Sequence, residues 1–73
     1  MTKLEAKRYY KAHLDDRSGD RIVDVDIFDL LGSQHVNFIV ISKNHVVWRN
    51  MYEVVRWDDG SAGLRYISTR LLQ

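Results

Sequence analysis

The feature that most constrains the fold is an unbroken run of four apolar residues, Phe38 to Ile41, in a chain of only 73 residues. Apolar and polar residues alternate in most other segments, which is typical of strands that bury one face. A strand without a polar break is typical of one that is covered on both faces. The run therefore predicts the central strand of a sheet, from about His35 to Ser42. The second face of that sheet must be covered either by closure into a small barrel or by a partner.

Length and composition restrict the class of protein further. We expect one small β-rich domain over residues 1–73, because a chain of this size holds a single core. The absence of cysteine excludes disulfides and thiolate zinc sites. A net charge of +1 gives no global electrostatic argument for nucleic acid or an acidic membrane. The first ten residues lack the apolar run of a signal peptide, and no stretch approaches the ~20 apolar residues of a membrane span. We therefore expect a cytoplasmic protein that does not contact membranes.

The first segment, from about Leu4 to Leu14, is predicted to be a strand because its apolar residues have a period of two. The residues that share one parity are Leu4, Ala6, Tyr10, Ala12 and Leu14. A helix is the second choice, because Ala, Leu, Lys and Glu all tolerate one.

The second segment, Arg21 to about Leu31, alternates more clearly. Val23, Val25 and Ile27 are predicted on one face, with Asp24, Asp26 and Phe28 on the other. A hairpin turn at Ser18-Gly19 would pair these two segments. The predicted pairs are Leu14 with Val23, Ala12 with Val25, Tyr10 with Ile27, Lys11 with Asp26 and His13 with Asp24.

Three further turns are predicted, at Gly32-Ser33, at Lys43-Asn44 and at Asp58 to Ser61. The turn at Lys43-Asn44 would place Ile41 opposite Val46 and Ile39 opposite Trp48. The Asp59-Gly60 pair is typical of a turn with two positive φ angles. At the end of the chain, Leu64, Ile67 and Leu71 have helical spacing, which allows a short terminal helix. The fold class is therefore mainly β, an antiparallel meander of about five strands that either stays open or closes as an SH3-like barrel.

Two short segments resemble known families. Residues 52–67, YEVVRWDDGSAGLRYI, resemble the tight hairpin of small SH3-like barrels of the Tudor and chromo type. That resemblance implies peptide or nucleic-acid binding through aromatic side chains. Arg56 to Asp59 resembles a stretch in small β-rich ribonuclease toxins of toxin–antitoxin pairs, the TumE-like group. Their pattern continues into a histidine-rich segment, whereas this chain has no histidine after His45.

Catalytic and metal-binding patterns are weak. Asp24, Asp26 and Asp29 are carboxylates of the kind that hard divalent ions prefer, but they match no standard ligand spacing. Alternating acids on a solvated strand face are ordinary, so we predict no metal site and no cofactor. The three histidines are His13, His35 and His45. None can be placed beside a nucleophile, so we do not expect an enzyme.

The candidate binding residues are the aromatic and arginine side chains that are surplus for so small a core, because these types are enriched at protein interfaces. They are Trp48, Arg49, Tyr52, Arg56, Trp57 and Tyr66. The leading hypothesis is a non-enzymatic binding module that acts through protein–protein contacts and forms a homodimer. One alternative is a small β-barrel that binds nucleic acid. A second is a nuclease-like enzyme or toxin that uses His13 with Asp24 or Asp26.

Overall fold

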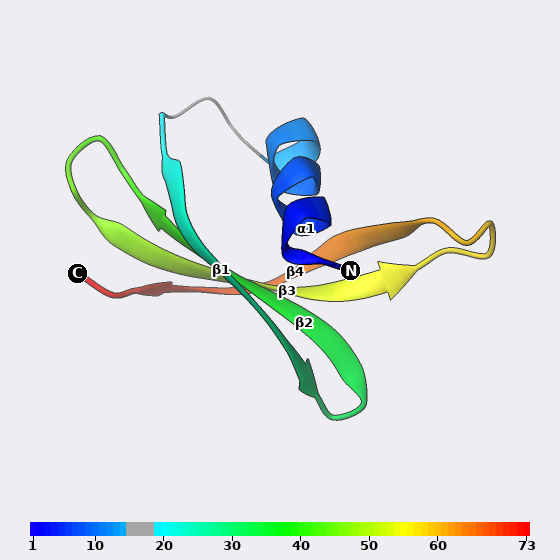
Figure 1. Ribbon diagram of the computed structural model, residues 1–73. Helices are drawn as coiled ribbons and strands as arrows, with labels where there is room; N and C mark the ends of the chain where they lie inside the picture. The colour runs from blue at the N-terminus through cyan, green and yellow to red at the C-terminus, as the bar shows by residue number, and fades with distance from the viewer. Residues whose placement is uncertain (15–18) are drawn as a thin grey trace.

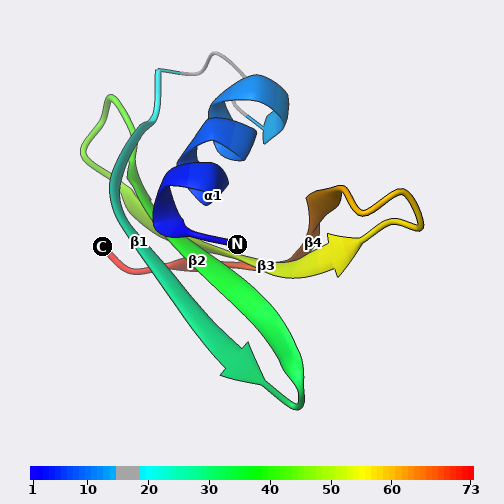
Figure 2. The ribbon, with the colours of Figure 1, turned by 45° about the vertical axis from the view of Figure 1, so that its right-hand side comes forward.

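One short helix lies on one face of a strongly twisted, four-stranded antiparallel sheet (Figures 1 and 2). The computed structural model describes residues 1–14 and 19–73. The elements are α1 (Lys3–Tyr9), a π-helical continuation η1 (Tyr10–Leu14), β1 (Arg21–Leu30), β2 (Ser33–Ile41), β3 (Val47–Arg56) and β4 (Ala62–Leu71). The strands are ordered β1-β2-β3-β4, as in a meander.

The mainly β, antiparallel prediction is confirmed, the predicted strand count is wrong, and of the two alternatives for the sheet the open one is found. The described residues form four strands, not five, and these make one open sheet rather than a closed SH3-like barrel. None of the helices in this part of the chain has the length and apolar character needed to cross a membrane.

The first segment is a helix, not the predicted strand. Thr2 and Glu5 form a capping box, in which the Thr2 hydroxyl accepts from the Glu5 N–H at 3.1 Å. The Glu5 carboxylate accepts from the Thr2 N–H, also at 3.1 Å, and this backbone hydrogen bond lowers the pKa of Glu5. Ala6 and Tyr10, four residues apart, are buried against the sheet. The strand pairs predicted between this segment and β1 are therefore wrong, while residues 15–18 of the predicted turn lie outside the described residues.

The turn between β1 and β2 lies one residue earlier than predicted. Leu30 pairs with Ser33, so the two turn residues are Leu31 and Gly32, with φ of 51° and 82°. Two positive φ angles belong to the hairpin turns that match the strand twist. Leu31 therefore adopts a backbone conformation that normally favours glycine. Its side chain is 97% exposed, so it gains no packing contacts in return.

The register between β2 and β3 also differs from the prediction by one residue. Ile41 pairs with Val47 and Ile39 with Arg49, instead of with Val46 and Trp48. The loop is longer than the predicted two-residue turn, because His45 adopts a φ of 63° and the Ser42 N–H bonds to the Val46 carbonyl at 2.8 Å. A type I turn followed by one left-handed residue is the usual form of such a lengthened hairpin loop.

The predicted hairpin of residues 52–67 is confirmed as β3 and β4. Within its turn, positive φ occurs only at Gly60 and not at Asp59. The terminal segment is strand, not helix. A bulge leaves Ile67 as an extra residue, so Leu64 and Leu71 face the same side at an odd separation. The bulge therefore gives the apolar residues of this strand a spacing that resembles the spacing in a helix.

The core lies between the helix and one face of the sheet. Val36, Phe38 and Val40 of β2 are at its centre and are at most 1% exposed. Phe38 contacts Tyr10 of η1 and Tyr52 of β3, with ring centroids 4.8 Å and 5.6 Å apart. The other core residues are Ala6, Val25 and Leu64. The prediction for Val23 is wrong, because a bulge between Ile22 and Asp24 leaves it half exposed.

Candidate functional site

The second face of the sheet is covered by no other element of the described residues. We call it the open face and define it by register, since side chains paired across strands share a face. From β1 and β2 it includes Asp24, Asp26, Phe28, His35, Asn37, Ile39 and Ile41. From β3 and β4 it includes Val47, Arg49, Met51, Glu53, Val55, Arg65, Ser68 and Arg70.

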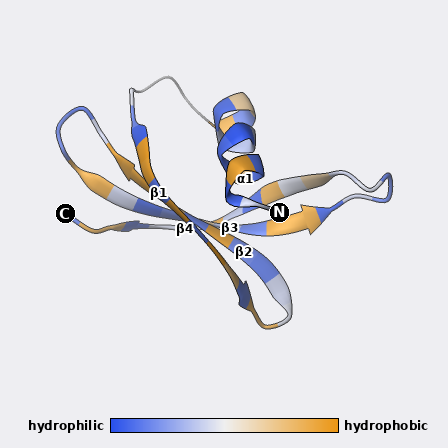
Figure 3. Ribbon diagram, viewed as in Figure 1, coloured by the Kyte–Doolittle hydropathy of each residue, from blue (hydrophilic) through white to orange (hydrophobic). Residues whose placement is uncertain are grey.

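The middle of the open face is apolar. Ile39, Ile41, Val47, Met51 and Val55 are all half-buried by their neighbours in the twisted sheet. Figure 3 shows how apolar and polar residues alternate along the strands, so that each face receives its own set. The apolar run in β2 predicts that both faces are covered. Within the described residues the helix covers only one of them.

Two polar side chains are embedded in this surface. His35 is 5% exposed, stacks on Phe28 with ring centroids 5.6 Å apart, and has its Nδ1 atom 2.9 Å from the Ser33 carbonyl oxygen. The Oδ1 atom of Asn37 is buried and has no hydrogen-bond partner in the described part of the chain. A buried acceptor without a donor costs free energy, so this position destabilises the single copy.

Most charges on the open face are separated by strand, although Arg21, which pairs with Ile41, adds a basic residue at the start of β1. Asp24 and Asp26 lie on β1, whereas Arg49 and Arg70 face each other directly on β3 and β4. Glu53 and Arg65 form an ion pair on this face. Within residues 1–14 and 19–73, neither Arg49 nor Arg70 has a carboxylate within salt-bridge distance.

Three of the four aromatic residues among the six predicted binding residues lie along β3 and β4 on the helix-covered face. Tyr52 is buried in the core, and its ring contacts Tyr66 edge to face at 5.8 Å. Burial raises the pKa of Tyr52, and the neighbouring Tyr66 adds to this rise. Tyr66 is 57% exposed, while Trp48 is half-buried against the core. The Tyr66 hydroxyl lies 2.7 Å from the hydroxyl of Thr69, so this ring is held by local contacts.

The other three predicted residues are dispersed. Arg49 is on the open face, and Arg56 is exposed at the end of β3, on the helix-covered side. Trp57 is 53% exposed and packs beside Gly63, where an added β-carbon would lie 3.1 Å from its Cη2 atom. The six residues therefore do not form one site, although Tyr52 and Tyr66 are brought together. The open face was missed as a unit, but the predicted grouping of Asp24, Asp26 and Phe28 was its first signal.

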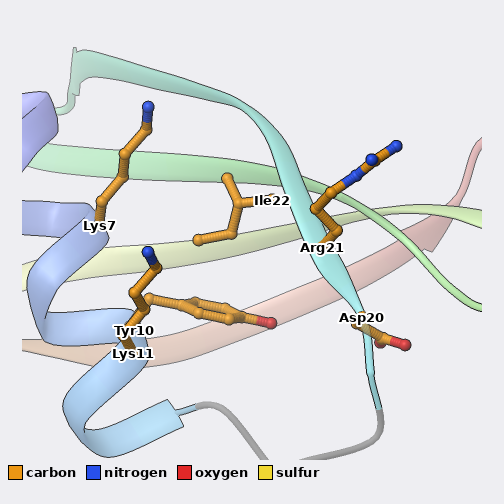
Figure 4. Close-up of a pocket in the computed structure, with 6 residues that line it drawn as sticks. All are labelled: Lys7, Tyr10, Lys11, Asp20, Arg21 and Ile22. Carbon is orange, nitrogen blue, oxygen red and sulfur yellow. The ribbon is translucent and has the colours of Figure 1, made fainter.

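A small hollow between the helix and β1 is the other candidate (Figure 4). It is lined by Lys7, Tyr10 and Lys11 from the helical segment, by Asp20 just before β1, and by Arg21 and Ile22 at the start of β1. Its volume of about 200 Å³ is below that of usual small-molecule sites, which are roughly 300–1,000 Å³. Its exposed lysines alone do not define a ligand site.

The residues considered for catalysis do not meet. His13 lies on η1 against Tyr9, with ring centroids 4.6 Å apart, on the helix side of the sheet. Asp24 and Asp26 lie on the opposite, open face. The histidine–aspartate pair of the nuclease hypothesis is therefore separated by the sheet.

Comparison of the chain with protein-family models, with curated proteins and with solved structures finds no match.

Proposed function

We propose that this chain is a small non-enzymatic binding module that acts through protein–protein contacts and self-associates through the open face. One observation carries the proposal: the sheet has a half-buried apolar face that no element of the described residues covers. Open two-layer structures of this kind bury one sheet face against a helix and leave the other for water or a partner. An apolar centre on that second face favours a partner.

The energetics support a moderate, concentration-dependent association. Completing the burial of a half-buried Ile, Val or Met gains about 1 kcal/mol. The open face contributes five such residues from each copy, namely Ile39, Ile41, Val47, Met51 and Val55. Their summed gain is of the same order as the ~4–15 kcal/mol lost in translational and rotational freedom on association. We therefore expect dissociation on dilution rather than a permanent dimer.

The test is the solution mass across a concentration series, measured by light scattering and sedimentation equilibrium. Met51 lies between Asn37 and Ser68 at the centre of the open face, so Met51→Glu places a charge where the partner packs. Leu4→Glu is the matched control, because Leu4 is an exposed apolar residue on the helix. We expect a dimer for the wild type and for Leu4→Glu, and a folded monomer for Met51→Glu.

A wild-type chain that stays monomeric up to millimolar concentration would contradict self-association. Far-UV circular dichroism of each variant separates loss of the dimer from loss of the fold.

A further inference from the structure

One row of residues across the open face runs from acidic to basic. Asp24 on β1 pairs with Ile39 on β2, Ile39 pairs with Arg49 on β3, and Arg49 pairs with Arg70 on β4. The row therefore begins with a carboxylate, passes an apolar residue and ends with two guanidinium groups. Asp26 adds a second carboxylate on the β1 side.

The two arginines are unfavourably placed in a single copy. Like charges directly opposite on neighbouring strands destabilise a sheet, and Arg49 is half-buried. Asp24 is at the far edge of the same row, with two strands between it and Arg70. Strands are ~4.8 Å apart, so Asp24 and Arg70 are separated by roughly 14 Å and cannot pair within one copy.

We propose that the occupant of the open face is a second copy of this chain, stacked face to face so that β1 of each copy lies over β4 of the other. This inference rests on the proposed function and specifies its geometry. A closed dimer has a twofold axis, which for two sheets stacked with aligned strands runs either along the strands or across them. An axis along the strands, between β2 and β3, exchanges the sheet edges and brings Asp24 of each copy to Arg70 of the other. An axis across the strands would instead place β1 over β1, with carboxylates facing carboxylates.

The same arrangement accounts for the centre of the face. Exchange of the edges places β2 of one copy over β3 of the other, so Ile39 and Asn37 face the strand that holds Arg49 and Met51. Stacked sheets are ~10 Å apart, a distance that an arginine side chain of one copy and an aspartate side chain of the other bridge together. Ile39 of one copy then lies over Arg49 of the other, and Asn37 lies over Met51.

The size of the face is adequate for such a contact. Four strands at ~4.8 Å spacing, up to ten residues long at ~3.4 Å each, present roughly 600 Å² of nominal area. Stable interfaces bury about 800 Å² of accessible surface from each partner, which is the same order.

The test is a charge exchange between two variants of the full chain. In its own homodimer, Asp24→Arg alone sets the introduced guanidinium against Arg70 of the other copy, and Arg70→Asp alone sets two carboxylates together. We expect each single variant to dimerise roughly tenfold or more weakly than the wild type.

An equimolar mixture of the two variants forms a heterodimer in which one of the two edge contacts joins two introduced groups of opposite charge and the other joins the two original ones. In this heterodimer both edge contacts therefore join opposite charges. The mixture is compared with the double variant, Asp24→Arg with Arg70→Asp, whose homodimer also pairs opposite charges at both edges.

The double variant is the decisive arm. In its homodimer the positive and negative groups of each edge contact are exchanged, so both contacts still join opposite charges. We therefore expect its affinity to return to the wild-type range, although each single change weakens the dimer. In the mixture of single variants, one contact joins the two introduced groups and the other joins Asp24 to Arg70, so we expect the same recovery.

The controls and the readout separate this inference from the proposed function. Asp29→Arg and Arg56→Asp make the same charge changes on the helix-covered face and should leave dimerisation unchanged. Circular dichroism reports whether each variant folds, and recovery in the mixture requires both chains to be folded. Recovery in sedimentation, lost at high salt, supports the edge-exchanged stack.

If the wild type dimerises but both single variants dimerise as well as it does, this geometry is overturned and self-association stands. That outcome is also expected if the copies join through the outer edge of β4 or stack with β1 over β1. A monomeric wild type overturns the proposed function and this inference together.

Discussion

Substituting Val36 by alanine should cost far more stability than the same change at Val47. Both valines lie within the sheet, but Val36 is completely buried under the helix, while Val47 is half-buried on the open face. Val36 pairs with Ile27 on one side and Tyr52 on the other, so its methyl groups fill the centre of the core.

The expected magnitude follows from the atoms removed. Loss of two buried carbon groups costs ~0.8 kcal/mol each in transfer free energy. A partly collapsed cavity adds about 0.5–1 kcal/mol at ~24 cal/mol per Å³. The total is about 2–3 kcal/mol, out of a stability of roughly 4–11 kcal/mol for a chain of 73 residues. We expect Val47→Ala to cost less than about 1 kcal/mol in the monomer.

Urea denaturation followed by tryptophan fluorescence and far-UV circular dichroism measures both values. It should be run at several protein concentrations. The loss for Val36→Ala should be independent of concentration because its contacts lie within one copy, whereas the loss for Val47→Ala should grow as the dimer becomes populated. Equal losses for the two variants at the lowest concentration would refute the assignment of one covered and one open face.

Three further predictions concern local structure and pH. Thr2→Ala removes the helix cap shared with Glu5 and should reduce stability by about 1 kcal/mol, with a loss of helical signal in circular dichroism; an unchanged unfolding midpoint would contradict the role of the cap. Leu31→Gly relieves a positive φ at an exposed position and should raise stability by about 0.5–1 kcal/mol, whereas a lower midpoint in urea would be inconsistent with strain at this turn. The raised pKa of Tyr52 means that the folded state favours its neutral form, so its contribution to stability is present below about pH 10 and is lost as the pH rises through the folded pKa. Tyr52→Phe should therefore reduce the alkaline loss of stability, which unfolding midpoints measured between about pH 8 and 11 would detect.

The strands and their order could be predicted because they follow from local patterns. Alternation of apolar and polar residues identified the solvent-facing side of β1, and the clustered glycines and polar residues located the three hairpins. The capping box of Thr2 and Glu5 was also present in the sequence and would have favoured the helix over the strand. The prediction of a strand instead followed the period of two among five apolar residues. The helix leaves some of these residues exposed, including Leu4 and Ala12.

Each wrong detail of register depends on one extra residue in a strand or a loop. Bulges at Val23 and Ile67 each shift the alternation by one position, and the left-handed residue His45 lengthens a loop. A shift of one residue exchanges the faces of a strand, so Trp48 joined the helix-covered side and Arg49 the open side. Neither bulges nor loop lengths have a strong signature in one sequence, because the free energy that they cost is offset by packing contacts elsewhere in the fold.

The sequence by itself determined that this chain forms an antiparallel β-meander with β2 inside the sheet, because periodicity and an unbroken apolar run are local properties. The tertiary structure decided which residues share a face. It brought Asp24, Ile39, Arg49 and Arg70 into one row, from four strands that are far apart in the chain. Register depends on the sum of the contacts across the whole sheet, so the charge pattern of the open face exists only once the sheet has formed.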